Sequence, residues 1–383
     1  MNKGRRKIVF VNQSAGYLTI ENINEFAGYF DDLALLYGTM TPNQYPLDNR
    51  VTCVRVIKKT RKSNLGKVLR WSLASLQIHL YLAFRFKGYE IFYYTLPPFS
   101  YLSSLILRRK FSIMVFDVYP DILASFGIGK KNLIYRLWSM ANRRLFAKAH
   151  RIFTISNSLR DVLSQYVPVN KIEVVTPWGS ISNLTPVPKY ENPFTKELGL
   201  EKKLVVQYSG NIGMTHNVEL LVELARDLKE FSTISFVIIG RGKKVGLIRK
   251  LIEKYSLANC ILLPFQPENR ILYSLSNADI GVVMLDDKAG RFSVPSKVYN
   301  IMAVGSALLA IASPESDLGS IVSRYENGVC IPANEHEAIK NYLIEMSIDH
   351  EKLAQYRINS IRAAADFTSK NAKLIADSYL MEE

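Results

Sequence analysis

Short apolar segments alternate with helix-length amphipathic segments along almost the whole chain. The apolar segments are of strand length and rich in β-branched and aromatic residues. This alternation is typical of α/β proteins, in which helices cover both faces of a parallel sheet. We predict strands over residues 7–12, 51–57, 90–95, 111–118, 151–156 and 171–176, and again over 204–208, 235–239, 260–263, 280–285, 307–311 and 328–331.

A proline-rich segment separates the two series of strands. Residues 176–193 contain four prolines and follow neither helical nor strand periodicity, which indicates a linker. A chain of 383 residues is also long enough for two domains. We predict an N-terminal domain over residues 1–185, a C-terminal domain over 186–366, and a last helix over 367–383 that is able to cross back to the N-terminal domain.

The net charge of +15 comes from the N-terminal half of the chain. Residues 1–190 hold 27 Lys and Arg against 10 Asp and Glu, whereas residues 191–383 hold 22 against 24. Such a positive face can meet the phosphates of a membrane, a lipid carrier or a nucleic acid. The basic run 58–62 (KKTRK) and the apolar-rich stretch up to residue 86 favour docking on an anionic membrane. The alternative is a core helix with solvated charges.

The sequence favours a cytoplasmic protein that associates peripherally with the inner face of the membrane. The apolar run 8–11 is too short for a signal peptide, and the stretch 71–86 is too short and too polar to span a bilayer. Cys53, Cys260 and Cys330 lie in apolar strand-like runs, so we expect buried thiols rather than disulfides or a zinc site.

Two loops after strands of the second half combine glycines with groups that suit an anion. The loop SGNIGMTHNVELL contains Gly210 and Gly213 and leads into a helix near residue 218, and a helix N-terminus offers amide groups to anions. The loop GRGKK adds the cations Arg241 and Lys243, although it is not a Gly-x-Gly-x-x-Gly fingerprint. A plain strand-to-helix turn and solvated charges are the alternative interpretations.

The segment AGRFSVPSKVYNIMAVGSALLAIA, residues 289–312, predicts a third anion-binding element. Pro295 fits the first turn of a helix, with Ser293 or Val294 near the cap and Ser296 and Lys297 in the first turn. A lysine at a helix start opposes the helix dipole, so its position is easier to understand if a phosphate binds there.

These elements together resemble the family-4 retaining glycosyltransferases of the GT-B fold, especially the bacterial sugar transferases of O-antigen, capsule and exopolysaccharide assembly. SGNIG, VIIGRGKK, SNADIGVVML and SVPSKVYNIMAVG occur in the family order. The resemblance implies two Rossmann-like domains that face each other across a cleft, with the nucleotide-sugar donor bound mainly by the second. It also implies retention of the anomeric configuration and no metal or other cofactor.

The sequence departs from the family at several donor positions. Many members carry two glutamates where this chain has Phe292 and Asn300, and the Asn300 amide can still donate a hydrogen bond to a ribose hydroxyl. The Arg and Lys that many members place after the first strand of this domain are also absent, which leaves the diphosphate to other cations. The donor-binding residues that we predict are Gly210, Asn211, Gly213, Arg241, Lys243, Ser296, Lys297 and Asn300.

The first half is similar to the family's acceptor domain in the segment FDVYPD, residues 116–121. Asp117 stands at a predicted strand end as a candidate catalytic residue, with a capping role as the alternative. Gly16, in the short loop QSAGY, and Asp121 are the predicted acceptor-side residues. Asp286 and Asp287 are adjacent and do not form the Asp-x-Asp pair of metal-dependent transferases, so no metal ligand is predicted.

The resemblance predicts transfer of a sugar from a nucleoside-diphosphate sugar to a glycan or a polyprenyl-diphosphate-linked acceptor. A sugar-nucleotide epimerase or dehydrogenase would need an early Gly-x-Gly-x-x-Gly loop, which QSAGY does not provide. A non-enzymatic nucleic-acid-binding protein would explain the basic first half, but no nucleic-acid-binding motif is present and we expect no nucleic-acid partner.

Overall fold

The computed structural model describes residues 5–41, 46–59, 64–126, 129–181, 185–214, 216–285 and 294–381. The chain forms two compact units, Met1–Ser180 with Ser369–Glu383, and Ile181–Thr368. These divisions fall within five residues of the predicted boundaries at 185/186 and 366/367. Residues 60–62 of the basic run, Asp286, Asp287, Phe292 and Ser293 lie outside the described residues.

The first unit is a parallel sheet with the strand order β3-β2-β1-β4-β5-β6-β7. Its described strands are β1 (Lys7–Ala15), β2 (Asp32–Met40), β3 (Val51–Arg55), β4 (Glu90–Tyr94), β5 (Phe111–Val115), β6 (Ile152–Thr154) and β7 (Ile172–Val174). The helical elements between them are α1 (Tyr17–Phe26), α2 (Asn64–Leu80), η1 (Tyr81–Arg85), η2 (Ser100–Ser103), α3 (Ser104–Leu107), η3 (Asp121–Phe126), α4 (Leu133–Lys148), α5 (Asn157–Leu163) and η4 (Val169–Lys171).

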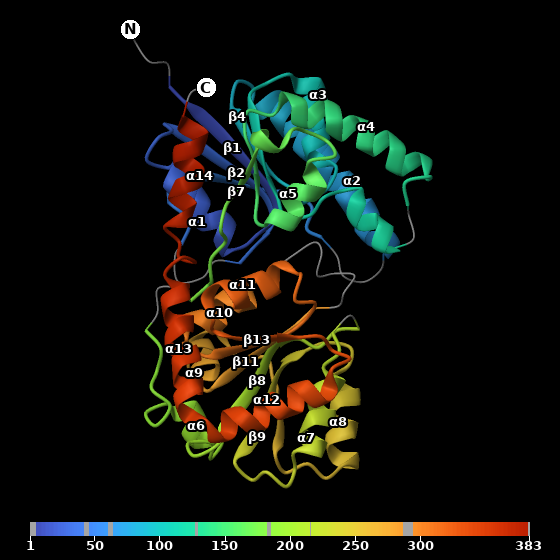
Figure 1. Ribbon diagram of the computed structural model, residues 1–383. Coiled ribbons are helices and arrows are strands. Elements are labelled where there is room, and N and C mark those ends of the chain that lie inside the picture. The colour runs from blue at the N-terminus through green and yellow to red at the C-terminus, as the bar shows by residue number, and fades with distance from the viewer. Residues whose placement is uncertain are drawn as a thin grey trace. The chain divides into compact units, whose positions relative to one another are not determined.

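Helices cover both faces of this sheet. In Figure 1, α1 lies on one face, and α2, α3, α4 and α5 lie on the other. The second face buries Ile78 and Leu82 from the α2 and η1 region, Leu145 and Phe146 from α4, and Leu159 from α5. The alternation of apolar strands and amphipathic helices in the sequence therefore corresponds to a unit of three layers, with the sheet between two layers of helices.

Strand β2 was missing from the prediction. Its sequence DLALLYGTM is rich in Leu and Ala, which favour helices as readily as strands, so the local pattern does not identify it. Pairing with β1 and β3 on its two sides makes it a strand. A Cβ on Gly38 would lie 2.9 Å from the Gln13 carbonyl oxygen, so the absence of a side chain there permits the close packing of β2.

The last helix, α14 (Asn371–Leu380), belongs to the first unit and packs against α1. The Tyr379 ring lies 5.2 Å from the ring of Phe26, and its hydroxyl donates to Glu90 Oε2 at 2.6 Å. The Arg151 guanidinium donates to the carbonyl oxygen of Ser378 at 3.0 Å. The end of the chain therefore completes the helix layer over β1 and β4.

The second unit is a parallel sheet with the order β10-β9-β8-β11-β12-β13. Its described strands are β8 (Leu204–Asn211), β9 (Ile234–Arg241), β10 (Cys260–Pro264), β11 (Ile280–Met284), β12 (Ala307–Ile311) and β13 (Gly328–Ile331). Its described helices are α6 (Pro193–Glu197), α7 (Glu219–Asp227), α8 (Val245–Lys254), α9 (Glu268–Ser276), α10 (Lys297–Ala303), α11 (Asp317–Tyr325), α12 (His336–Ile348) and α13 (His350–Ala364).

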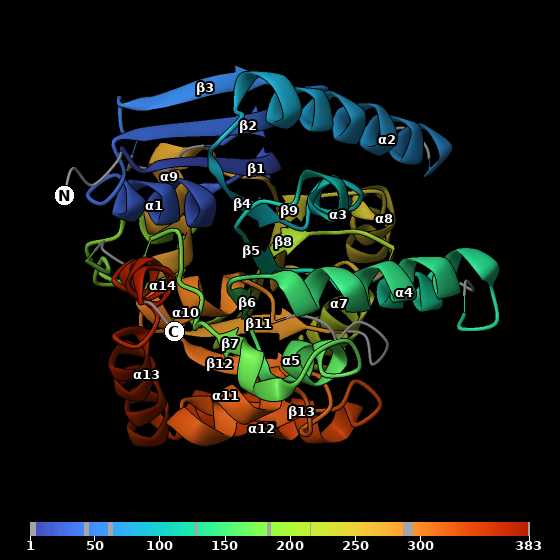
Figure 2. The same cartoon turned by 90° about the horizontal axis from the view of Figure 1, so that it is seen from above.

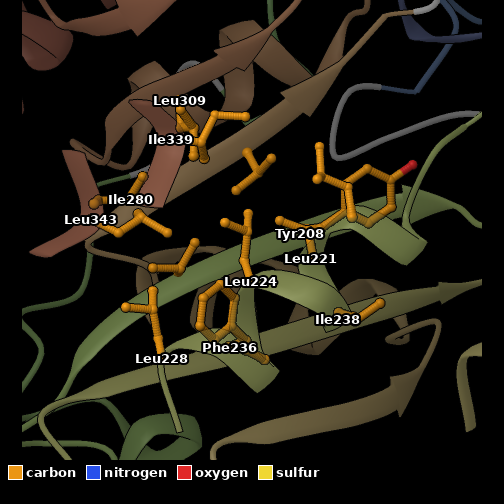
Figure 3. Close-up of a cluster of buried hydrophobic side chains, with 14 of the residues drawn as sticks. Tyr208, Leu221, Leu224, Leu228, Phe236, Ile238, Ile280, Leu309, Ile339 and Leu343 are labelled. Atoms are coloured by element: carbon orange, nitrogen blue, oxygen red, sulfur yellow. The ribbon is translucent and has the colours of Figure 1, made fainter. Parts of the chain in front are cut away.

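The core of the second unit lies between this sheet and the helices α7 and α12. Figure 3 shows Leu224 of α7 and Leu343 of α12 converging with Phe236 of β9 and Leu309 of β12. All four side chains are fully buried. Truncating one such leucine to alanine costs about 2–5 kcal/mol, so this cluster fixes the sheet that positions the strand-end loops.

Two further expectations concern the thiols and the membrane. Cys260 is buried and Cys330 is half-buried, but Cys53 is exposed because it lies on the edge strand β3, so the prediction of a buried thiol was wrong there. Among the described residues, no helix has both the length and the apolar character needed to cross a bilayer.

Candidate functional site

A cavity of about 540 Å³ opens at the carboxyl ends of the strands in the second unit. β8 and β11 are neighbours there although β9 and β10 come between them in the chain. Such a change of direction is where doubly wound sheets bind ligands, and the volume suits a small molecule. The lining residues are Met214, Asn217, Lys244, Met284, Leu285, Ile311, Ala312, Pro332, Ala333 and Asn334.

Glycines allow the loops after β8 and β9 to approach each other backbone to backbone. A Cβ on Gly240 would lie 1.9 Å from the carbonyl oxygen of Gly210, and a Cβ on Gly242 would lie 2.2 Å from that of Ile212. The Ile212 N–H also donates to the carbonyl oxygen of Arg241 at 2.9 Å. The two glycine-rich loops therefore form one joined structure, and their glycines have a packing reason in addition to the predicted ligand approach.

Lys297 lies beside this joined structure. Its Nζ is 4.0 Å from the centroid of the Tyr208 ring, and a Cβ on Gly210 would lie 3.7 Å from the same Nζ. The lysine as a whole is half-buried, but its ammonium end is enclosed, and desolvation lowers its pKa from the usual 10.5 to about 7. It forms no ion pair with a carboxylate of the described residues.

Two further basic side chains come together at the loop after β8. The pKa of His216 is lowered by burial and by the charges of Lys297 and Lys244. The Lys244 ammonium donates to the His216 carbonyl oxygen at 3.0 Å and lies 2.8 Å from Glu219 Oε1. Among the described residues, Glu219 supplies the carboxylate of this cluster, and it is already paired with Lys244. An anion bound here would meet the Lys297 charge without displacing an existing ion pair.

The helix after Pro295 begins later than expected. The described helix α10 has Ser296 as its N-cap and Lys297 as its first residue, and the Ser296 side chain makes no capping hydrogen bond. Pro295 therefore precedes the helix instead of lying in its first turn. Asn300 is half-buried, and its Oδ1 accepts a hydrogen bond from the Ile181 N–H at 3.4 Å, so this amide also holds the segment that enters the unit.

The remaining predicted donor residues lie at the rim of the joined loops. Asn211, Arg241 and Lys243 are exposed. The Arg241 guanidinium lies 4.8 Å from the centroid of the Phe265 ring. Gly213 leaves room for the Asn211 amide, because a Cβ there would lie 2.6 Å from Asn211 Nδ2. Backbone pairing between β8 and β9 brings Asn211 and Arg241 side by side.

The predicted acceptor residues belong to the first unit, where they follow the carboxyl ends of β1 and β5. The backbone N–H of Asp117 donates to Thr95 Oγ1 at 3.3 Å, so the loop after β5 is held to the end of β4. Burial raises the pKa of the Asp117 carboxyl, and the charge of Lys59 partly opposes this effect. Gly16 is the N-cap of α1, and no atom lies within 4 Å of the position of a Cβ there.

Asp121 is held inside the first unit. Its Oδ1 accepts from the Tyr135 hydroxyl at 2.6 Å and its Oδ2 from the Tyr166 hydroxyl at 2.5 Å. Gln165 Nε2 adds a longer contact of 3.4 Å. A buried carboxylate with these partners links α4 to the end of α5, and we assign it a structural role.

Three residues of the site were not predicted from sequence. Tyr208 lies below Lys297, and its hydroxyl donates to the Asn211 carbonyl oxygen at 2.8 Å, which braces the loop. His216 and Lys244 complete the basic cluster. The second lysine of GRGKK was the only local signal for Lys244, whereas Tyr208 and His216 look like ordinary strand-end and loop residues in the sequence.

This arrangement suits a phosphorylated ligand of small size. A half-buried cation beside joined glycine loops can neutralise phosphate charge, and the adjoining cavity is large enough for a nucleoside. Among the residues that the structure describes, no group of three or more His, Cys, Asp or Glu side chains is arranged to hold a metal ion.

Comparison with known proteins agrees with this interpretation. Residues 191–363 match the family model described as glycosyl transferases group 1. The chain is 23% identical over 348 residues to the probable glycosyltransferase WbjE of Pseudomonas aeruginosa, covering 87% of this chain and 86% of that protein. It is 24% identical over 269 residues to the putative colanic acid biosynthesis glycosyl transferase WcaI of Escherichia coli (strain K12), covering 64% and 66%.

Solved structures with a similar fold include Alr3699/HepE of Anabaena in complex with UDP and glucose, with a TM-score of 0.70 and 15% identity. That match covers 97% of this chain and 98% of the other. WaaG, a glycosyltransferase involved in lipopolysaccharide biosynthesis, matches with a TM-score of 0.69 and 13% identity over 96% of this chain and 99% of its own. The second unit is thus a glycosyl transferases group 1 domain, and the chain is a glycosyltransferase of the two-domain GT-B architecture.

Proposed function

We propose that the protein transfers a sugar from a nucleoside-diphosphate sugar bound by the second unit. The observation that carries this proposal is the enclosed ammonium of Lys297 beside the glycine loops, without a described carboxylate partner. Folding removes the Lys297 ammonium from water, which costs free energy. A bound diphosphate would compensate for this desolvation because its negative charge favours the ammonium form. The nucleoside would occupy the adjoining cavity, with Arg241 and Lys243 at its exposed rim.

The reaction that we propose requires mainly electrostatic stabilisation of the leaving diphosphate. The bond between the anomeric carbon and the diphosphate oxygen breaks, and a bond from that carbon to the acceptor hydroxyl oxygen forms. Negative charge grows on the diphosphate, where Lys297 stabilises it more strongly than in water. A diphosphate oxygen takes the acceptor proton, which allows retention without a protein nucleophile. We also propose that no metal ion takes part.

We propose that the acceptor is a hydroxyl of a glycan or of a polyprenyl-diphosphate-linked sugar, in the assembly of a cell-surface polysaccharide. The names of the relatives WcaI and WaaG, which refer to colanic acid and lipopolysaccharide, support this class. In the first unit, the half-buried Asp117 at the end of β5 is the candidate to contact the acceptor hydroxyl. A lipid-linked acceptor would place the enzyme at the cytoplasmic face of the membrane.

A ligand screen tests the donor class. We expect one of UDP-, GDP- or dTDP-sugars to raise the melting temperature of the purified chain, because ligands that bind only the native state stabilise it. Lys297→Met should lose most of this shift. Lys250→Met, which removes an exposed lysine on α8, is the matched control and should retain it. If a mixed-sequence oligonucleotide at the same salt stabilises the chain and no sugar nucleotide does, the proposal is wrong.

A further inference from the structure

Two helices of the first unit expose a series of large apolar side chains. The series runs along the outer sides of α2 with η1 and of α4, and we call it the apolar outer face. Phe84 is 79% exposed, Leu76 57% and Leu133 68%. The members of the face are Val68, Leu69, Leu73, Leu76, Leu80, Phe84, Leu133, Ile134, Leu137 and Met140.

The spacing of these residues places them on one side of each helix. Leu69, Leu73, Leu76 and Leu80 are separated by three or four residues, which aligns them along one stripe of α2. The opposite side of α2 faces the core through Ala74 and other buried residues. Each helix therefore has an apolar side toward the sheet and a second apolar side toward solvent, which the core does not require.

The two helices present their stripes from the same face of the sheet. α2 and α4 both contact η2, and their inner sides belong to one hydrophobic cluster. Figure 1 shows both helices on the side of the sheet away from α1 and α14, and Figure 2 shows both extending past the strands with α3 between them. Soluble monomers rarely expose so many large apolar side chains on two neighbouring helices without a binding role.

The charges around the apolar outer face have a single sign. No Asp or Glu occurs between residues 49 and 89 or between 122 and 160. Exposed cations stand at both ends of the α2 stripe, at Arg70 and Arg85, and along α4 at Arg136, Arg143 and Arg144. Apolar stripes bordered by Lys and Arg are typical of helices that lie in the interface of an anionic bilayer.

We propose that the apolar outer face inserts into the interfacial region of an anionic lipid bilayer while the flanking arginines contact lipid phosphates. This deepens the proposed function, because it names the surface that brings the enzyme to a lipid-linked acceptor. A second copy of the chain would fit the face less well, because two faces of the same positive charge would repel each other. The occupant that complements both features is a bilayer with anionic headgroups.

Vesicle flotation with the full chain tests this proposal. The probes are vesicles of phosphatidylcholine alone and of an equimolar mixture of phosphatidylcholine and phosphatidylglycerol. We expect the wild type to float with the anionic vesicles at moderate salt and to remain largely unbound with the neutral ones. Leu73→Gln with Leu76→Gln should weaken binding roughly ten- to a hundredfold, since each side chain loses part of its burial in lipid.

Matched control variants distinguish binding through the apolar outer face from binding through any other exposed apolar residue. Leu374→Gln removes an equally exposed leucine on α14, which is 58% exposed, and should leave flotation unchanged. Arg143→Gln with Arg144→Gln should reduce binding to anionic vesicles by roughly thirtyfold, because each cation near the surface contributes about 1 kcal/mol and two are lost. Thermal unfolding of each variant checks that the fold is intact.

Three results would overturn the proposal. The first is that the wild type binds neither kind of vesicle. The second is that the variant Leu73→Gln with Leu76→Gln binds anionic vesicles as well as the wild type does. The third is sedimentation of the wild type as a dimer that the same variant dissociates, which would make the face an interface between copies. Stabilisation by sugar nucleotides is measured on the same variants, so a failure of donor binding is distinguished from a failure of membrane docking.

Discussion

Replacing Lys297 with methionine should make the ligand-free protein more stable while weakening its affinity for nucleoside diphosphates. Methionine keeps most of the length of the side chain and can still pack on the Tyr208 ring, but it carries no charge. The native environment disfavours that charge, because desolvation holds the pKa of Lys297 near 7 instead of 10.5. A stability gain combined with a binding loss is the expected signature of a residue that serves a ligand.

The size of the effect follows from the pKa difference. A group with a pKa of 10.5 in the unfolded chain and about 7 in the folded chain opposes folding by about 4 kcal/mol at pH 7. Lys297 is only half-buried as a residue, so screening by solvent reduces this to about 2 kcal/mol. For a unit of this size, Lys297→Met should then raise the melting temperature by about 4–8 °C.

The pH dependence has a definite sign. The folded-state pKa of Lys297 is lowered, so the penalty is fully present below about pH 7 and disappears as the pH rises toward about 10.5. The advantage of Lys297→Met over the wild type should therefore shrink across this window. A bound diphosphate favours the ammonium form, so donor binding to the wild type should weaken as the pH rises above about 7 and should be accompanied by proton uptake.

Differential scanning calorimetry between about pH 6.5 and 9.5, with and without UDP or whichever nucleotide stabilises the wild type, measures both effects. Lys250→Met is the control for loss of one lysine charge and should change neither stability nor binding by more than about 0.5 kcal/mol. The reasoning is refuted if Lys297→Met is less stable than the wild type at pH 7, or if it binds the nucleotide equally well.

Three further predictions use other parts of the structure. Gly242→Ala should lower the free energy of unfolding in urea by about 2 kcal/mol or more and weaken nucleotide binding, because a Cβ there would lie 2.2 Å from a carbonyl oxygen. Gly246→Ala, where no atom lies within 4 Å of the Cβ position, should change neither. Asp279→Ala should lower the free energy of unfolding by about 3–5 kcal/mol because the Lys189 ammonium loses a buried partner, and a change below about 1 kcal/mol would contradict this role. Asp117→Asn should slow sugar transfer roughly tenfold to a hundredfold while leaving nucleotide binding intact, as steady-state kinetics and calorimetry would measure.

Most of the fold of the second unit could be predicted from the sequence. The predicted strands 307–311 and 328–331 have the observed bounds. Strands buried on both faces require continuous apolar runs, and such runs are visible without knowing their neighbours. β2 was missed because its leucines and alanine suit a helix equally well, and only its pairing with β1 and β3 decides between the two.

The sequence by itself determined the class of the protein and the loops that could meet a phosphate, because these depend on residue types that are adjacent in the chain. Only the tertiary structure decided the chemical state and the surroundings of the key groups. Lys297 has a lowered pKa because Tyr208 and the loop after β8 enclose it, and Asp121 has a structural role because two tyrosines reach it from α4 and beyond α5. The burial of a group and the electrostatic potential around it depend on residues that are distant in sequence, so local sequence patterns do not reveal them.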